Sequence, residues 1–189
     1  MDSMTTGAII LAAGQSRRFG AQDKLLAMVD GMPMITRVMR LVVRPDIASR
    51  VAIVSSADIA AYAVALGLSV CWVTPGAPQS ASLKAGLRYL KDKRLSRILI
   101  LLGDMPYVTS ADLSTLLASP DARPVCAMLN ETLMPPALIP HRLIDALEAL
   151  VGDRGAGAFL LKQPDLHRVV LSPRHLRDID FPEDLEVSV

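Results

Sequence analysis

The chain has 189 residues and a formal net charge of +1; 51% of its residues are hydrophobic and 4% are aromatic. This length fits one globular domain, residues 1–189, with enough apolar side chains for a substantial core. The near-neutral charge, with basic residues scattered along the chain, excludes the basic surface typical of nucleic-acid binding.

The apolar runs, the N-terminus and the cysteines indicate in which compartment the protein is expected. No apolar run approaches the about 20 residues that span a bilayer, and the N-terminus lacks the basic start of a signal peptide. Cys71 and Cys126 lie in apolar runs, which favours buried, reduced thiols. We therefore expect a cytoplasmic protein that binds neither nucleic acid nor membrane.

Short apolar runs bounded by Gly, Pro, Ser or Asp predict buried strands at residues 7–12, 51–55, 69–73, 97–102 and 124–129. Apolar residues at three- and four-residue spacing predict helices at 34–43, 59–66, 82–91 and 111–117, the last with Thr109 as its N-cap. This alternation predicts a doubly wound α/β fold, with a Rossmann-like, mostly parallel sheet and ligands at the carboxyl ends of strands.

The pattern changes after Asn130. A Pro135-Pro136 pair is followed by predicted helices at 142–151 and 156–162, a strand at 169–171 and the tail DIDFPEDL. No composition break or repeat marks a second domain.

A basic, glycine-bounded loop, LAAGQSRRFGAQDK, follows the first predicted strand. It matches neither a Walker A loop nor the G-x-G-x-x-G fingerprint. Gly14 and Gly20 allow tight backbone turns, while Arg17, Arg18 and Lys24 supply charge, which together suit a polyphosphate. A solvated basic loop with Lys24 at the start of a helix is the alternative.

Three candidate carboxylates lie later in the chain, after predicted strands. Asp104 comes directly after the strand at 97–102, where a lone carboxylate suits Mg²⁺. Asp178 and Asp180 share one face if their segment is extended. The alternatives are a turn former at Asp104 and a helix cap at Asp178 or Asp180. With the basic loop, these carboxylates would complete a phosphoryl- or nucleotidyl-transfer site.

Motifs in a fixed order make these features more specific: LAAGQSRRFG followed by KLL, QSASLKAGL from Gln79, LGDMP from Leu102, GDRGA from Gly152 and DIDFPEDL from Asp178. Together they resemble the nucleotidyltransferases that make molybdopterin dinucleotide cofactors, in particular the molybdenum cofactor cytidylyltransferases. The resemblance runs over nearly the whole chain and is more specific than any single motif.

The resemblance implies an Mg²⁺-dependent enzyme of nucleotidyltransferase fold that transfers CMP from CTP to the terminal phosphate of molybdopterin and releases pyrophosphate. The product would mature the cofactor of a molybdenum hydroxylase, whose apoenzyme is then a partner. By the same resemblance Arg18, Lys24 and Asp104 are catalytic, and Asp104 and Asp180 hold the metal, with Asp178 the weaker candidate.

The resemblance also implies nucleotide-binding positions, namely Leu11, Ala12, Ala13, Gly14, Arg18, Lys24, Ser80, Ser82 and Gly103. Arg17 occupies a variable place in the pattern. Ser80 and Ser82, with Gln79, correspond to a base-reading loop, although either serine would also suit the cap of a helix beginning near Leu83.

Three positions depart from the pattern, all in the half of the chain that handles the acceptor. Met134-Pro135-Pro136 replaces Gly-x-Pro, Gly157 stands where an arginine often follows Gly-Ala, and Phe181 replaces a small threonine. The turn at 152–157 would admit the pterin and lend Arg154 to its phosphate, or would simply connect two helices.

The acceptor and the base therefore stay open at this point. The alternatives are a guanylyltransferase, a nucleotidyltransferase for another small phosphate, and a noncatalytic escort for nucleotide or molybdopterin. The Ala-Ala-Gly of the loop, where guanylyl relatives tend to have Ala-Gly-Gly, favours CTP. His141, His167 and His175 lack metal-ligand spacing and are interpreted as surface or capping residues.

Overall fold

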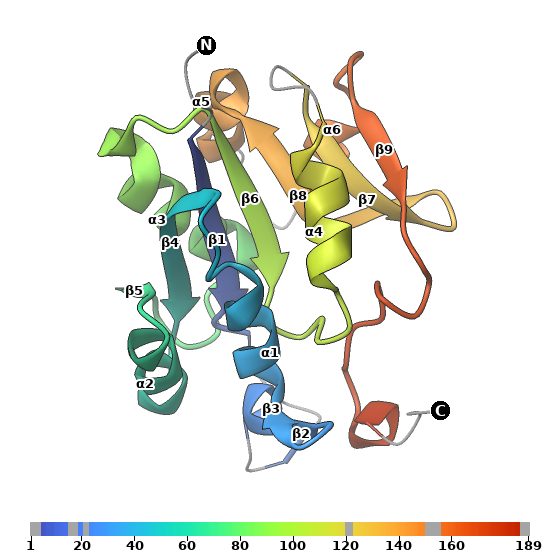
Figure 1. The fold of residues 1–189 in the computed structure, drawn as a ribbon. Coiled ribbons are helices and arrows are strands. Elements are labelled where there is room, and N and C mark those ends of the chain that lie inside the picture. The colour runs from blue at the N-terminus through green and yellow to red at the C-terminus, as the bar shows by residue number, and fades with distance from the viewer. Residues whose placement is uncertain (1–4, 15–18, 21–22, 120–122, 150–155, 186–189) are drawn as a thin grey trace.

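A twisted seven-stranded sheet forms the centre of the computed structural model, which describes residues 5–14, 19–20, 23–119, 123–149 and 156–185 (Figure 1). Its strands, in spatial order, are β5 (Ser69–Trp72), β4 (Ile47–Val54), β1 (Thr6–Ala12), β6 (Arg97–Leu102), β8 (Thr132–Pro140), β7 (Val125–Leu129) and β9 (His167–Val170). All neighbours pair in parallel except β8, which is antiparallel to both β6 and β7. A small hairpin, β2 (Met28–Val29) and β3 (Met32–Pro33), stands apart from this sheet.

Helices cover both faces of the sheet. One hydrophobic cluster joins the sheet to α1 (Met34–Leu41), α2 (Ala57–Ala65) and α4 (Ser110–Leu117). The other joins it to α3 (Gln79–Leu90), α5 (Ile144–Glu148) and α6 (Ala156–Leu160). Short 3₁₀ turns are η1 (Lys24–Leu26), η2 (Lys91–Lys93), η3 (His141–Leu143) and η4 (Pro182–Leu185). The predicted doubly wound, mostly parallel α/β fold is confirmed.

The apolar sequences of β1 and β6 follow from this position. Both strands lie inside the sheet with helices on each side, so side chains of both alternating sets, such as those of Ile9 and Ile10, are buried. Continuous apolar runs are therefore the pattern expected for these strands.

Strand β8 is not predicted by the sequence patterns, because prolines lack the N–H that a sheet requires. In the structure, Cys126 of β7 pairs with Ala137, whereas the next residue, Ala127, pairs with Met134. Pro135 and Pro136 thus fall in a bulge between these pairs. The pairing of β8 with β6 begins only at Ala137, so neither ladder requires the missing donors.

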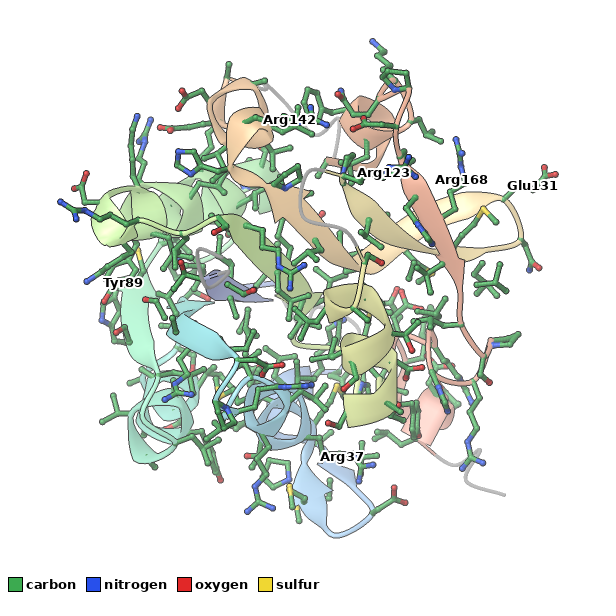
Figure 2. All side chains as sticks on the ribbon, turned by 45° about the horizontal axis from the view of Figure 1, so that its top comes forward. Arg37, Tyr89, Arg123, Glu131, Arg142 and Arg168 are labelled. Atoms are coloured by element: carbon green, nitrogen blue, oxygen red, sulfur yellow. The ribbon has the colours of Figure 1, made fainter. Side chains whose placement is uncertain are left out.

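The cysteines and the helix lengths agree with the sequence analysis, except that Cys71 is less buried than expected. Both cysteines are free thiols, Cys126 being buried and Cys71 only partly so. Within the described ranges, the helices are too short or too polar to cross a membrane. Figure 2 shows Arg37 near the β2–β3 hairpin and Arg142 and Arg168 toward the opposite end, so Arg37 lies apart from these two arginines.

Gly86 determines how closely α3 approaches β1, and we predict that Gly86→Ala is destabilising. A Cβ at this position would lie 2.8 Å from Cγ2 of Ile9. We expect the free energy of unfolding, measured in urea, to fall by about 1–3 kcal/mol because the core is overpacked.

Gly157→Ala in α6 is the matched control. Its added Cβ would meet the carbonyl oxygen of Leu133 at 3.6 Å, an ordinary contact. The variant should be as stable as the wild type or up to about 1 kcal/mol more stable, since alanine favours helix. Equal stabilities for Gly86→Ala and the wild type would contradict the close approach.

Candidate active site

The candidate site lies where the parallel strands β1 and β6 end side by side. Leu11 of β1 is in register with Leu102 of β6, and the amide of Gly103 donates a hydrogen bond to the carbonyl oxygen of Leu11 at 2.9 Å. A Cβ on Gly103 would lie 2.9 Å from Cδ1 of Ile35. Glycine at 103 therefore allows β6 to turn tightly and to present Asp104 beside the loop that follows β1.

Lys24 connects this turn to the C-terminal segment. Its Nζ donates hydrogen bonds to Oδ2 of Asp104 at 2.8 Å, Oδ1 of Asp180 at 3.0 Å and the carbonyl oxygen of Ile179 at 3.1 Å. Asp23 caps η1, its carboxylate accepting from the amide of Leu25 at 3.1 Å, and so fixes the turn from which Lys24 extends. Lys24 thus links segments that are distant in sequence.

Burial and charge act in opposite directions on these groups. Burial by itself lowers the pKa of Lys24, but the carboxylates of Asp104 and Asp180 outweigh it, and the net pKa is raised. Burial raises the pKa of Asp178, and the negative charges of Asp180 and Asp104 add to this increase. Lys24 is therefore an ammonium ion at neutral pH within an acidic group of side chains.

The two carboxylates fit a divalent cation. Asp104 and Asp180 both approach one cationic atom, the Nζ of Lys24, and their side chains are 23% and 45% exposed. Mg²⁺ and similar hard ions take one or two carboxylates and complete their shell with water and substrate phosphates. Among the described residues there is no cluster of three or more His, Cys, Asp or Glu that could hold a metal.

Asp180 is held in place by its own segment. The amide of Ile179 donates to the carbonyl oxygen of Asp104 at 3.0 Å. The carboxylate of Asp184 accepts from the amides of Asp180 and Phe181, both at 2.9 Å, and Arg177 pairs with Asp184 at 3.1 Å. These hydrogen bonds close the turn that presents Asp180.

A second contact attaches the C-terminal segment to α4. Nδ1 of His175 lies 2.9 Å from Oδ2 of Asp112. Asp112 also completes a capping box with Thr109, which confirms Thr109 as the predicted N-cap of α4. His175 therefore joins a helix cap to the segment that leads to Asp180.

Two adjoining cavities lie at this end of the sheet, and Lys24 and Asp104 line the smaller one. The smaller has a volume of about 120 Å³ and is lined by Leu11, Ala13, Gly14, Lys24, Leu25, Ala77, Gln79, Ser82, Leu102 and Asp104. The larger has a volume of about 270 Å³ and is lined by Leu11, Gln79, Ser80, Leu83, Lys84, Ile100, Leu102, Leu133, Met134, Pro135, Leu147, Ala156, Gly157 and Ala158. Leu11, Gln79 and Leu102 belong to both.

Most of the positions predicted to bind nucleotide lie at these cavities. Leu11 lines both, and Ala13 and Gly14 line the smaller one. Ala12 instead packs in the core at 3% exposure, and Gly103 is buried in its turn. Arg17, Arg18 and the turn at 152–155 lie outside the described residues, so the role of Arg18 stays a prediction.

Ser80 and Ser82 line different cavities. Ser82 is buried and faces the smaller cavity, whereas Ser80 lines the larger one. Helix α3 begins at Gln79 after Pro78, and no side chain caps it. The alternative in which Ser80 or Ser82 caps this helix is therefore wrong.

Sequence reasoning did not identify the groups that support the site. No sequence pattern assigned a supporting role at the site to the carbonyl of Ile179 or to the side chains of His175 and Arg177. Asp184 gives the one usable signal, since an acid four residues after Asp180 and next to a proline turn suits a cap.

The chain is similar to known proteins. The MobA-like NTP transferase domain matches residues 8–169. The bifunctional enzyme IspD/IspF of Rhizobium leguminosarum bv. trifolii is 30% identical over 51% of this chain and 26% of its own length. The 2-C-methyl-D-erythritol 4-phosphate cytidylyltransferase of Dehalococcoides mccartyi is 52% identical over 18% of this chain and 14% of its own length. The chain thus matches about a quarter or less of these relatives.

Solved structures share the fold. The homologue of Mycobacterium tuberculosis Rv0371c from Mycobacterium sp. strain JC1 has a TM-score of 0.81 at 22% identity, covering 98% of this chain and 95% of that one. A nucleotidyl transferase from Methanothermobacter thermautotrophicus has a TM-score of 0.80 at 20% identity, with coverages of 96% and 94%. M. tuberculosis Rv0371c in complex with manganese has a TM-score of 0.77 at 18% identity, with coverages of 98% and 100%.

Asp112 should make stability depend on pH. Burial by itself raises the pKa of Asp112, but hydrogen bonds from Thr109 and the contact with His175 outweigh it, so the net pKa is lowered. A lowered pKa stabilises the fold above the unfolded value of about 3.9, and this contribution is lost as pH falls through the folded value.

We therefore expect Asp112→Asn to lower the free energy of unfolding by about 1 kcal/mol at neutral pH. The difference from the wild type should shrink as pH falls below about 4. Asp58→Asn, an exposed acid in the first turn of α2, is the control and should change stability by less than about 0.5 kcal/mol. A constant difference from pH 7 to about pH 3 would exclude this role for Asp112.

Proposed function

The chain belongs to the MobA-like NTP transferase domain family, and on that premise we propose that it transfers CMP from CTP to the phosphate of molybdopterin, with Mg²⁺ as the required cation and pyrophosphate as the second product. The observation that carries this proposal is the position of Lys24. Its ammonium group lies between Asp104 and Asp180, and Lys24 lines a cavity that Ser82 also lines.

The reaction is a displacement at phosphorus. An oxygen of the acceptor phosphate attacks the α-phosphorus of CTP, a phosphoanhydride bond forms, and the bond from that phosphorus to the oxygen of the β-phosphate breaks. The acceptor phosphate is already ionised at neutral pH, so no general base is required. If a cation takes the carboxylates of Asp104 and Asp180, the ammonium group of Lys24 is released from them, donates to the phosphate oxygens instead and stabilises the negative charge that develops there. A divalent cation at Asp104 and Asp180 would supply further charge neutralisation.

The lining of the smaller cavity supports a nucleotide base as its ligand. Ser82 and Gln79 line it and offer hydrogen bonds to the edge of a base. The relative from Dehalococcoides mccartyi carries the name of a cytidylyltransferase. The manganese bound by M. tuberculosis Rv0371c supports dependence on a divalent cation.

Support for molybdopterin as acceptor comes from the ordered motifs. Those motifs extend into the acceptor half of the chain, where DIDFPEDL includes Asp180. A molybdenum hydroxylase apoenzyme would then receive the product.

Pyrophosphate release tests the proposal directly. We expect release with CTP, but not with ATP, GTP or UTP, when molybdopterin and Mg²⁺ are present, and loss of release when EDTA is added. Release with GTP would indicate a guanylyltransferase, and release with CTP and only another phosphate acceptor would exclude molybdopterin. Tight CTP binding without release would indicate a noncatalytic escort.

Asp104→Asn should lower the rate of pyrophosphate release by at least about 100-fold while the protein remains folded. The change removes the charge needed to hold the cation but keeps an oxygen near Nζ of Lys24. Asp46→Asn makes the same substitution in the exposed ion pair with Arg44, which is 2.6 Å long, and should leave the rate unchanged. If Asp104→Asn kept the wild-type rate, this result would contradict the assignment of Asp104 as a ligand of the cation.

A further inference from the structure

Arg37 of α1 joins the two segments of chain that carry Lys24 and Asp104. Its Nε donates a hydrogen bond to the carbonyl oxygen of Pro106 at 3.2 Å, and its Nη1 donates to that of Val29 at 3.3 Å. Pro106 lies two residues after Asp104, and Val29 belongs to β2, the strand that follows Lys24 and η1. Figure 2 shows Arg37 beside the β2–β3 hairpin. One guanidinium group therefore links both segments.

The turn from Gly103 to Pro106, which presents Asp104, meets α1 at both of its ends. At the first end, a Cβ on Gly103 would lie 2.9 Å from Cδ1 of Ile35, so the backbone of the turn packs against the helix. At the second end, Arg37 holds the Pro106 carbonyl. Proline has no N–H, so this carbonyl is the hydrogen-bonding group of its backbone. Helix α1 thus fixes the backbone on each side of Asp104.

The hairpin at the other end of the link is itself well anchored. Its turn consists of Asp30 and Gly31, with φ values of 48° and 77°. Val29 is buried at 3% exposure. The carbonyl of Ala27, the residue that ends η1, accepts a hydrogen bond from the amide of Met34 at 2.9 Å. The hairpin and the start of α1 therefore form one unit directly after η1.

The carbonyl contacts, rather than the ion pair with Asp30, are the main part of this link. Nη1 of Arg37 lies 3.1 Å from Oδ2 of Asp30, whose side chain is 55% exposed. Exposed ion pairs are screened by water and contribute little to stability. The donors of a guanidinium group, in contrast, are fixed in one planar fork, so its hydrogen bonds are directional. Arg37 thus supplies geometry more than charge.

We propose that Arg37 is a positioning residue for nucleotidyl transfer. By holding the Pro106 carbonyl and the hairpin together, it keeps the carboxylate of Asp104 in place for cation binding beside Lys24. This inference rests on the nucleotidyl transfer proposed above, and it adds a residue that is not among those lining the two cavities. Groups that orient a metal ligand from outside the site typically change metal affinity or activity by about 10- to 100-fold.

Arg37→Met tests this role because it removes the donors and keeps an unbranched apolar side chain. We titrate the full chain with Mn²⁺ alone and follow the EPR signal of the free ion. The dissociation constant of Mn²⁺ should rise about ten-fold. Loss of a positive charge would by itself have the opposite effect, since it favours binding of a cation. Weaker binding therefore reports the position of Asp104 and not the charge of Arg37.

Arg50→Met is the matched control. Arg50 of β4 also donates to a backbone carbonyl, that of Val42, at 3.3 Å, and Val42 is the residue that ends α1. This substitution should leave the dissociation constant of Mn²⁺ unchanged, whatever it does to the free energy of unfolding.

If Arg37→Met does not fold, Arg37→Lys takes its place. Lysine donates from a single point and cannot hold both carbonyls as the fork does, so the dissociation constant of Mn²⁺ should still rise at least about three-fold. Unchanged Mn²⁺ affinity in a folded Arg37 variant would overturn the inference.

Pyrophosphate release separates failure of this inference from failure of the proposed function. In Arg37→Met, the Mg²⁺ concentration at half-maximal rate should rise about ten-fold, while KM for CTP changes less than about two-fold. Identical Mg²⁺ dependence in the wild type and Arg37→Met would overturn the role of Arg37 and leave nucleotidyl transfer standing. Absence of release by the wild type with every nucleoside triphosphate would refute nucleotidyl transfer, and the Mn²⁺ titration would still decide whether Arg37 positions Asp104.

Discussion

A buried ammonium group organises the functional end of this molecule. The side chain of Lys24 is only 11% exposed, and a charge so little hydrated needs nearby acceptors. Asp104, Asp180 and the carbonyl of Ile179 provide them. Because these acceptors come from the turn after β6 and from the C-terminal segment, satisfying one cation brings both segments to the end of β1.

The sheet makes this arrangement possible. Strands β1 and β6 are parallel neighbours in register, so the loops that follow them begin at the same level. The antiparallel strand β8 then extends the sheet beyond β6, and its residues 133–135 form one wall of the larger cavity. Pro135 of the bulge belongs to this wall, so a feature that interrupts strand pairing also shapes the cavity. The charged groups of Lys24 and Asp104 and a largely apolar cavity are thereby placed side by side.

The C-terminal segment depends on contacts outside the sheet. It lacks a strand between β9 and η4, and it is held by side chains instead: Asp184 closes the turn at Asp180, and His175 contacts the capping box of α4. Such contacts explain how a short, polar tail holds Asp180 at 3.0 Å from Lys24. The metal-binding geometry proposed for Asp180 therefore relies on residues that touch neither phosphate nor metal.

The sequence by itself determined the parallel strands, the helices between them and the type of chemistry, because continuous apolar runs, helical spacing and charged groups after strands are local properties. It also indicated Lys24, Asp104 and Asp180. Only the tertiary structure decided that these three meet, that Ser80 and Ser82 face different cavities, and that β8 forms despite its prolines. Each of these depends on register and on contacts between distant segments, which no local pattern encodes.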